Sequence, residues 1–195
     1  MIAYINGDLV LKTPTHVILD VNGIGYDIHI SLTTFSHIPD SGKCKLHTYL
    51  HIKEDAHTLY GFSSEQEKAL FSALISVSGV GPSTGRMILS SMEPQDIRHA
   101  IITENVGVIK SIKGIGPKSA QRLILELKDK LIKESDEDKI NILTGGNTAK
   151  SEALSALQSL GFTRNVAEKA IQKGEKDKGT GIPVEELIKY ALQNM

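Results

Sequence analysis

The 195-residue sequence contains no tryptophan, a single cysteine and only 5% aromatic residues. Cys44 cannot form an internal disulfide, which excludes a disulfide-stapled fold and fits a reducing compartment. No apolar run approaches the roughly 20 residues that a membrane helix requires. The opening MIAYINGDLVLK lacks the charged leader of a signal peptide. We therefore expect a cytoplasmic protein that does not associate with a membrane.

The chain also lacks a strong net charge, since its formal charge is −1. Its charges are nevertheless unevenly distributed. Residues 1–62 hold four Lys/Arg against six Asp/Glu, residues 63–131 hold nine against seven, and residues 132–195 hold nine against ten. A mildly basic middle region between two mildly acidic ends is compatible with a polyanionic partner, but it does not indicate one by itself.

Signatures of catalysis are missing as well. A Walker phosphate loop requires G-x-x-x-x-G-K-[ST]; Gly116, Lys118 and Ser119 resemble its end, but Ile112 replaces its first glycine. The glycine spacing of GVGPSTG does not fit a dinucleotide-binding fingerprint, and no strand pattern precedes it. No Ser/His/Asp order or carboxylate cluster suggests a hydrolase. We predict no catalytic residues and no cofactor.

Three histidines near the single cysteine raise the alternative of a zinc site. His47 and His51 share one face of an alternating strand, but Cys44 falls on the opposite face and His57 lies beyond a turn. Zinc ligands must converge on one point. We therefore predict no metal site and interpret the histidines as packed or solvated.

Residues 1–62 alternate between apolar and polar side chains, for example in HVILDVNGIGYDIHISL and KCKLHTYLHIKEDAHTLYGF. Period-two patterning bounded by Gly, Asn and Asp is typical of strands and hairpins. Five or six short strands over about sixty residues predict a small β-barrel of the oligonucleotide/oligosaccharide-binding (OB) type.

Residues 63–132 change to helical periodicity, and we expect this region to be all helical. Ser64 followed by Glu67 predicts a capping-box helix start. Pro94 suits the first turn of a later helix, because a proline there leaves no hydrogen bond unmade.

The remaining sequence divides into a linker and a small domain. The stretch 133–148 begins with a polar run and ends near a Gly-Gly pair, which is typical of a flexible linker. Residues 149–195 contain three short helical runs. They predict a three-helix module near the lower size limit for independent folding.

One short pattern occurs twice in the helical region, thirty-five residues apart. The stretch VSGVGPSTGRMILSSM occupies 77–92, and IKGIGPKSAQRLILEL occupies 112–127. In each copy two glycines flank one apolar residue, and a proline then stands at the start of an amphipathic run. The repeat predicts two helix–hairpin–helix motifs.

The helix start after each hairpin is expected to bind an anion, because unpaired N–H groups and the helix dipole both favour negative charge there. Lys118 and Arg122 lie one turn apart and can flank the same phosphate. The first copy is less basic, with Ser83 at the lysine position and Arg86 as its remaining cation. We predict DNA binding with little base selectivity, one hairpin per strand of a duplex. The predicted contacts are Gly79, Gly81, Ser83, Arg86, Lys113, Gly114, Gly116, Lys118, Ser119 and Arg122.

Two other functions remain open from the residues alone. A DNA-repair enzyme, either a glycosylase or a nuclease, uses similar hairpins with a catalytic Lys or Asp just beyond them. Lys118 and Lys128 are the candidates for that role, although no base-holding pocket can be argued. A module that binds RNA or the ribosome through the barrel is the third alternative.

The sequence also resembles the RuvA family, the DNA-binding subunits of the bacterial Holliday-junction branch-migration machine. The resemblance covers nearly the whole chain and rests on GIGYDIHIS, EDAHTLYGF, SGVGP and KGIGPKSAQRLILELKDKL, with a C-terminal helical module after a linker. It implies a flat homotetramer, or an octamer, that holds a four-way junction open and presents it to a hexameric RuvB-type ATPase. A RuvC-type resolvase is a further implied partner in recombination and repair.

The same resemblance implies a non-catalytic, multi-domain protein of mixed fold class. Its parts are an OB-like barrel at 1–62, an all-α tandem helix–hairpin–helix domain at 63–132, the linker at 133–148, and a three-helix, UBA-like module at 149–195.

Roles for residues outside the hairpins follow from this resemblance. It places Glu54 and Asp55 at the tetramer centre as an acidic pin, where carboxylates repel phosphates and disfavour ordinary duplex. Lys53, beside the pin, is a further implied phosphate contact. The family usually carries Lys or Arg at the position of Ser83, so the first hairpin depends more on its backbone and on Arg86. The implied motor-binding residues of the C-terminal module are Leu157, Leu160, Phe162 and Leu192.

Overall fold

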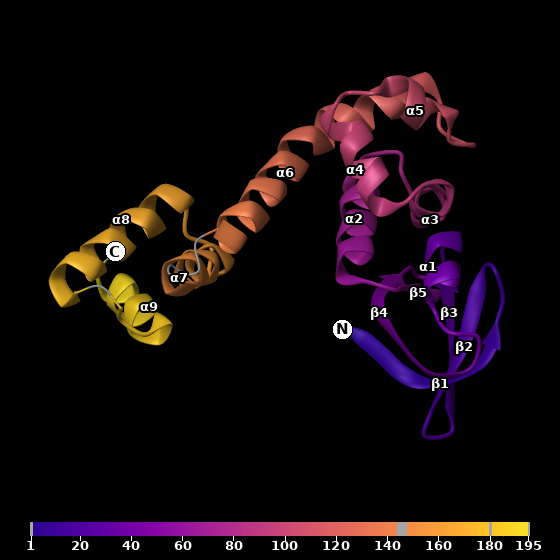
Figure 1. The fold of residues 1–195 in the computed structure, drawn as a ribbon, viewed down its shortest axis with the longest axis horizontal. Helices are drawn as coiled ribbons and strands as arrows, with labels where there is room; N and C mark the ends of the chain where they lie inside the picture. Colours follow the sequence, from indigo (N-terminus) through magenta and orange to yellow (C-terminus); the bar gives the residue numbers. More distant parts are fainter. Residues whose placement is uncertain (1, 144–147, 180, 195) are drawn as a thin grey trace. The chain divides into compact units, whose positions relative to one another are not determined.

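The computed structural model of the chain describes residues 2–143, 148–179 and 181–194. The strands are β1 (Tyr4–Lys12), β2 (His16–Val21), β3 (Ile24–Ile30), β4 (Gly42–Ile52) and β5 (His57–Phe62). The helices are α1 (Leu32–His37), α2 (Glu65–Ser76), α3 (Pro82–Ser91), α4 (Pro94–Ile102), α5 (Val106–Ser111), α6 (Pro117–Leu143), α7 (Thr148–Ser159), α8 (Arg164–Lys178) and α9 (Val184–Gln193) (Figure 1). The chain forms two compact units, Met1–Ile132 and Lys133–Met195.

The first unit begins with a closed barrel in the strand order β1-β2-β3-β5-β4. Strands β3 and β5 are parallel, and the other neighbouring pairs are antiparallel. Alternate side chains fill the interior, so Val17, Leu19, Ile28 and Leu46 are completely buried. The alternation therefore predicted the inward faces of β2 and β3 and of β4 as far as Thr48, whereas Ile52 at the end of β4 is 62% exposed. The OB-like barrel is confirmed.

A short helix, α1, interrupts the region for which only strands were expected. The side chain of Ser31 accepts a hydrogen bond from the backbone N–H of Thr34 and caps this helix. Six residues are too few to establish a helical period in the sequence, which explains why the pattern did not reveal α1. The helix lies between β3 and β4 in the chain and next to α3 in space (Figure 1).

The helical part of the first unit starts as predicted. Ser64 caps α2 by accepting from the N–H of Glu67 at 3.1 Å. Pro94 occupies the first turn of α4, where it breaks no hydrogen bond. From residue 63 to residue 132 the described chain contains only helices and short connections.

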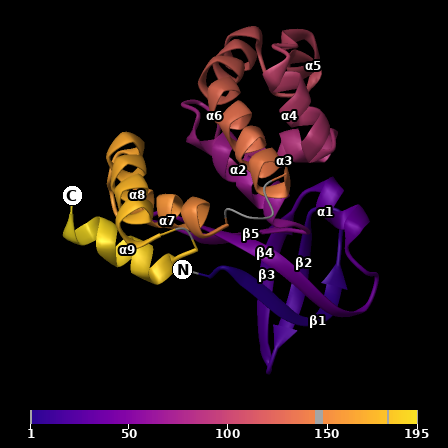
Figure 2. The ribbon, with the colours of Figure 1, turned by 60° about the vertical axis from the view of Figure 1, so that its left-hand side comes forward.

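The barrel and the helices share one apolar core. Phe71 of α2 is completely buried, and its ring centroid lies 5.5 Å from Tyr49, 5.2 Å from Tyr60 and 4.9 Å from Phe62. All three partners come from β4 and β5, and Figure 2 shows α2 standing on that end of the barrel. The hairpins are therefore built on a helix whose base is fixed in the barrel.

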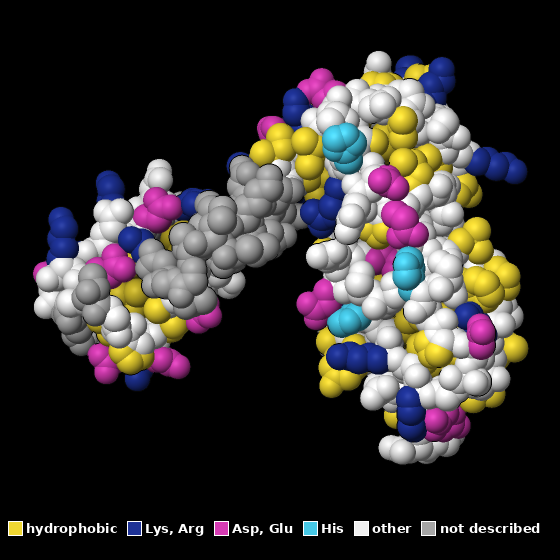
Figure 3. Space-filling model, viewed as in Figure 1, with side chains coloured by type: hydrophobic (Ala, Val, Ile, Leu, Met, Phe, Trp, Pro, Cys, Tyr) yellow, Lys and Arg dark blue, Asp and Glu magenta, His cyan; other side chains and the backbone are white. Residues whose placement is uncertain are grey.

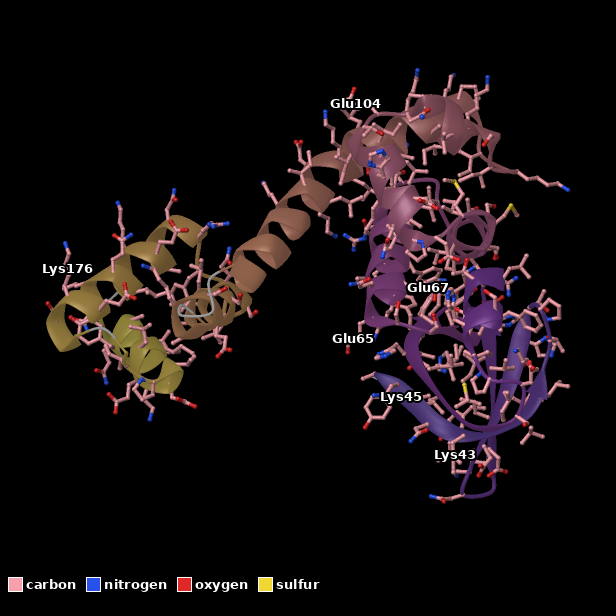
Figure 4. All side chains as sticks on the ribbon, in the orientation of Figure 1. Lys43, Lys45, Glu65, Glu67, Glu104 and Lys176 are labelled. Atoms are coloured by element: carbon pink, nitrogen blue, oxygen red, sulfur yellow. The ribbon has the colours of Figure 1, made fainter. Side chains whose placement is uncertain are left out.

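A buried carboxylate reinforces this junction. Glu67 is 1% exposed and accepts hydrogen bonds from the hydroxyls of Ser31 at 2.6 Å, Thr34 at 2.8 Å and Ser63 at 3.0 Å, and from the Ser63 N–H at 3.1 Å. In a capping box the acid would turn back to the N–H of its own cap residue. Here it accepts from Ser63, which follows β5, and from Ser31 and Thr34 at the start of α1, so one residue of α2 joins both segments (Figure 4).

The second unit packs α7, α8 and α9 around a small core that includes Ala153, Leu157, Ile171 and Leu187. The three-helix module expected from the sequence is thus present. Helix α6 continues to Leu143, inside the stretch assigned to a flexible linker, while residues 144–147 lie outside the described part. The predicted domain boundaries, including the linker, stay predictions. Within the described residues, no helix combines the length and the apolar character needed to cross a membrane.

Candidate nucleic-acid interface

The two repeated stretches adopt the same backbone turn between two helices. In the first hairpin the N–H of Val80 donates to the carbonyl of Val77 at 3.0 Å, and in the second the N–H of Ile115 donates to Ile112 at 3.1 Å. All four apolar side chains are buried. Two buried core residues therefore hold each hairpin in place, while the backbone at its tip faces outward.

A glycine is required at the tip of each turn. Gly79 has φ +89° and Gly114 has φ +87°, a region that residues with a side chain rarely adopt. At Gly114 a Cβ would also lie 3.4 Å from Sδ of Met87. The first glycine of each pair therefore has a conformational role.

The second glycine of each pair stands at an exposed helix start. Gly81 is the N-cap of α3 and has an extended backbone, with φ −85°, and a Cβ at Gly81 or Gly116 would meet nothing within 4 Å. Among the hydrogen bonds of the described residues, none uses the N–H of Gly81, Ser83, Gly116 or Lys118. Two open sets of N–H groups thus lie at the positive ends of helix dipoles, which is the geometry of a phosphate site.

The two hairpins contact each other reciprocally. Met87 of α3 packs against Gly114 of the second hairpin. Arg122 of α6 points Nη1 at the carbonyl of Ser78 in the first hairpin, at 3.5 Å. Met87 and Arg122 occupy equivalent positions of the repeat, so each motif uses the same position to contact the other.

Exposed cations flank mainly the second hairpin. Lys113 and Lys118 are exposed, and Ser119 is partly exposed. Arg122 forms an ion pair with Glu126 at 3.2 Å, so its guanidinium is partly engaged. Figure 3 shows Lys and Arg side chains gathered around α5 and the turn that follows it.

Lys110, exposed in the last turn of α5, extends this basic edge and was not singled out from the sequence. Lys110 lies only three residues before Lys113, and this spacing in the sequence could have identified it as part of the same basic edge. In the first hairpin Ser83 is exposed, and it contributes no charge.

Arg86 differs from the other predicted contacts because its side chain faces the barrel. Its Nη1 donates to the carbonyl of Thr15 at 3.0 Å and to Nδ1 of His29 at 3.1 Å. The equivalent position in the second motif is Gln121, which is exposed. The second motif therefore has no arginine at the position equivalent to Arg86.

The predicted acidic pin lies on the connection between β4 and β5. Lys53, Glu54 and Asp55 are all exposed, and the N–H of Lys53 donates to the carbonyl of Ala56 at 2.9 Å to close a tight turn. Two adjacent carboxylates and one ammonium group therefore project from one tip of the barrel.

The histidines considered for zinc do not converge with the cysteine. Cys44 is buried inside the barrel, and burial raises the pKa of its thiol. His47 and His51 are partly exposed on the other face of β4, and Nδ1 of His47 lies 3.6 Å from Glu65. Within the described residues no group of three His, Cys, Asp or Glu side chains has the arrangement of a metal site.

The four residues assigned to motor binding separate into core and surface. Leu157 is completely buried in the second unit, so its side chain is not available to a partner. Leu160 is 61% exposed, Leu192 is 44% exposed and Phe162 is partly exposed. The N–H of Phe162 donates to the carbonyl of Leu157, a helix-ending turn that directs Leu160 outward.

The fold and the two hairpins define a protein with a tandem helix–hairpin–helix domain built onto an OB-type barrel. Family models match along the chain: the RuvA N-terminal domain at residues 1–61, a SAM-like helix–hairpin–helix tandem at 71–129, and the RuvA C-terminal domain at 148–195. The chain belongs to the RuvA family.

Curated relatives agree with the family models over the full length. A protein of Cytophaga hutchinsonii is 51% identical over 197 residues, covering 99% of each chain. Proteins of Christiangramia forsetii and Flavobacterium psychrophilum are each 50% identical over 195 residues, covering 100% of both chains. All three are named "Holliday junction branch migration complex subunit RuvA".

Proposed function

We propose that this chain binds four-way (Holliday) DNA junctions as a homotetramer, holds them open and presents them to a hexameric RuvB-type ATPase for branch migration in recombination and repair. It acts as a non-catalytic subunit, in the cytoplasm. Assembly into an octamer and contact with a RuvC-type resolvase are part of the same proposal. The names of the full-length relatives support this assignment.

The paired hairpins are the observation on which the proposal depends. Their exposed N–H groups suit phosphates, which are the same for every base sequence, so the shape of the DNA should decide binding. The proposed contacts are Gly79, Gly81, Ser83, Lys113, Gly114, Gly116, Lys118, Ser119 and Arg122, with Lys53 at the barrel tip.

The alternative of a repair enzyme finds less support. A nucleophilic lysine needs a lowered pKa, whereas the hydrogen bond from Lys128 to Glu104 raises the pKa of this lysine. Lys118, the other candidate, is exposed at a helix start beside a proposed phosphate site, without a surrounding pocket among those described.

A gel-shift comparison tests the proposed function directly. The full chain is titrated with a four-way junction and with linear duplex of the same sequence, at several salt concentrations. We expect a clear preference for the junction and an affinity that falls steeply with salt as counterions are released. Equal affinity for both DNAs, or stronger competition by RNA hairpins, would contradict the proposal. Cleavage of damaged or branched DNA with Mg²⁺ would favour the enzyme alternative.

Neutralising the pin should reduce the selectivity for junctions. For Glu54→Gln combined with Asp55→Asn, we expect duplex affinity to rise about tenfold, because two carboxylates per subunit no longer repel phosphates. The ratio of junction to duplex affinity falls accordingly. As a control, Glu185→Gln combined with Glu186→Gln in the second unit removes the same charge. It should change neither the duplex affinity nor the ratio of junction to duplex affinity. Unaltered duplex affinity in the pin variant would remove the pin from the proposal.

The exposed Leu160 and Leu192 of the second unit and the partly exposed Phe162 are the proposed docking contacts for the motor. Leu160→Ala combined with Leu192→Ala should lower stimulation of a RuvB-type ATPase by about tenfold or more, since apolar anchors dominate such interfaces. Junction binding without the motor should not change. Lys176→Ala, at an exposed position of α8, serves as the control. Loss of junction binding together with stimulation would contradict a separate docking surface.

A further inference from the structure

Helix α3, which begins at the first hairpin, is fixed to the barrel by several polar contacts. The hydroxyl of Thr33 donates to the carbonyl of Leu89 at 2.6 Å, and the N–H of Leu32 donates to Oγ of Ser90 at 3.0 Å. Both contacts join α3 to α1. The Ser90 hydroxyl also donates to the carbonyl of Arg86 at 2.8 Å, which connects these contacts to the arginine.

Arg86 extends this attachment from α1 to the strands. Its Nη1 bridges two acceptors: the Thr15 carbonyl just before β2, and the imidazole of His29 on β3. The Thr15 carbonyl also accepts from the N–H of Ile30, so the arginine is attached at a point where β2 and β3 are joined. We call Arg86, Thr15 and His29 the Arg86 bridge.

The second hairpin has no equivalent bridge among the described residues. Gln121 is exposed at the equivalent position, and the hydrogen bonds of Arg122 and Lys128 on α6 go to Ser78 and Glu104, which lie outside the barrel. The second hairpin shares the apolar core of the first unit through Ile112 and Ile115, and it contacts the first hairpin through Met87 and Arg122. The Arg86 bridge therefore influences the position of both hairpins relative to the barrel.

We infer that Arg86 is a positioning residue that sets the angle between the hairpins and the barrel tip, and that it is not a phosphate ligand. This inference rests on the proposed function, because a four-way junction must meet the hairpins and the Glu54–Asp55 turn at the same time. A linear duplex that lies on the hairpins alone is not sensitive to that angle.

The bridge requires an unprotonated His29. A guanidinium only donates, so Nδ1 of His29 must be the acceptor, and a proton there removes the bond. Burial first, and then the charge of Arg86, lower the pKa of His29 from its ordinary value of 6.5. Asp27 on the same strand acts in the opposite direction, His16 on β2 lowers the pKa further, and the Tyr60 ring on β5 packs 5.8 Å away.

The sign of the pH effect follows from this lowered pKa. The unfolded chain binds the proton more readily than the folded one, so the contribution of the bridge is fully present above about pH 6.5. It declines as the pH falls below that value and through the lower pKa of the folded state. Acidification should therefore weaken the attachment of the hairpins to the barrel.

Arginine variants separate positioning from phosphate binding. Arg86→Gln and Arg86→Lys are compared with the wild type on a four-way junction and on linear duplex, at pH 7.5 and several salt concentrations. Positioning predicts that both variants lose about tenfold in junction affinity, since each breaks a hydrogen bond made by a charged group. Duplex affinity and its salt dependence stay unchanged. If Arg86 binds a phosphate instead, Arg86→Gln should lose the same affinity for both DNAs, and the slope of its affinity against salt should be smaller by about 0.9. Arg86→Lys should then keep the wild-type affinity for both.

A pH series provides the second readout and needs no change to Arg86. In the wild type, the ratio of junction to duplex affinity should fall as the pH is lowered from 7.5 through the pKa of His29 in the folded protein, which lies below 6.5. His29→Asn places an amide oxygen near the position of Nδ1, and asparagine does not titrate. The ratio of junction to duplex affinity of this variant should therefore not change with pH. His99→Asn, at an exposed position of α4, should behave as the wild type.

Three results would overturn the inference: a wild-type ratio that is level with pH, a His29→Asn ratio that falls as in the wild type, or equal losses on both DNAs for Arg86→Gln. If the arginine variants do not fold, as judged by thermal unfolding, the pH series alone decides. A wild type without any junction preference would contradict the proposed function itself, which is a separate outcome.

Discussion

Replacing Gly81 and Gly116 together with valine is expected to weaken binding to four-way junctions about a hundredfold or more, because charge-assisted hydrogen bonds to phosphate are lost at both helix starts. Neither residue needs a positive φ, and a Cβ meets no atom within 4 Å at either position. The fold should therefore accept both side chains. Their isopropyl groups would stand between the open N–H groups and a phosphate.

Gel shifts on junction and duplex DNA check this expectation, with thermal unfolding to confirm that the variant folds. Each single substitution should give about half of the effect on a logarithmic scale, since separate sites add. Thr163→Val is the matched control: Thr163 is also an exposed N-cap without a side-chain cap bond, at the start of α8. If the double variant binds DNA as the wild type does, the N–H groups of the hairpins are not the phosphate ligands.

The second large effect is expected on stability. Glu67→Ala should lower the free energy of unfolding of the first unit by about 2–4 kcal/mol, because buried hydroxyls of Ser31 and Thr34 lose their acceptor and a cavity remains. The loss falls on the junction between the barrel and the helices.

Denaturant unfolding of the full chain measures this change. Glu65→Ala is the control, since Glu65 is two positions away in the same first turn of α2 and its side chain is 86% exposed (Figure 4). Surface carboxylates contribute little, so we expect less than about 0.5 kcal/mol there. A result for Glu67→Ala within about 0.5 kcal/mol of that control would show that the buried network does not stabilise the junction.

The parts of the fold that the sequence predicted are those with local physical demands. Alternation over 1–62 indicated strands because the two faces of each strand meet different surroundings. The repeated glycines and prolines indicated hairpins because a positive φ at Gly79 and Gly114 and a proline at the first helical turn are local requirements. Neither signal depends on residues distant in the sequence.

Side-chain roles set by distant contacts were not predictable. Arg86 and Arg122 looked alike in the sequence as cations one turn into a helix. In the structure one faces the barrel and the other faces the opposite hairpin. Glu67 looked like half of a capping box, but its partner Ser31 lies 36 residues earlier in the chain, between β3 and β4. These assignments need the tertiary contacts themselves.

The leucines of the second unit show a similar limit. Leu157 and Leu160 are three positions apart, a spacing that places residues on one face of a helix. Helix α7 ends at Ser159, however, and the turn beyond it separates the two side chains, so that one is completely buried and the other is 61% exposed. Which of them meets a partner therefore depends on where the helix ends.

The core shared by the barrel and α2 determines how the protein can be dissected. A fragment that begins at residue 63 would lose Tyr49, Tyr60 and Phe62, and the fully buried ring of Phe71 would face water. Such a fragment exposes a large apolar patch and is expected to aggregate. A fragment that ends at Ile132 keeps this core intact, and it is the shorter form suited to expression and crystallisation with DNA.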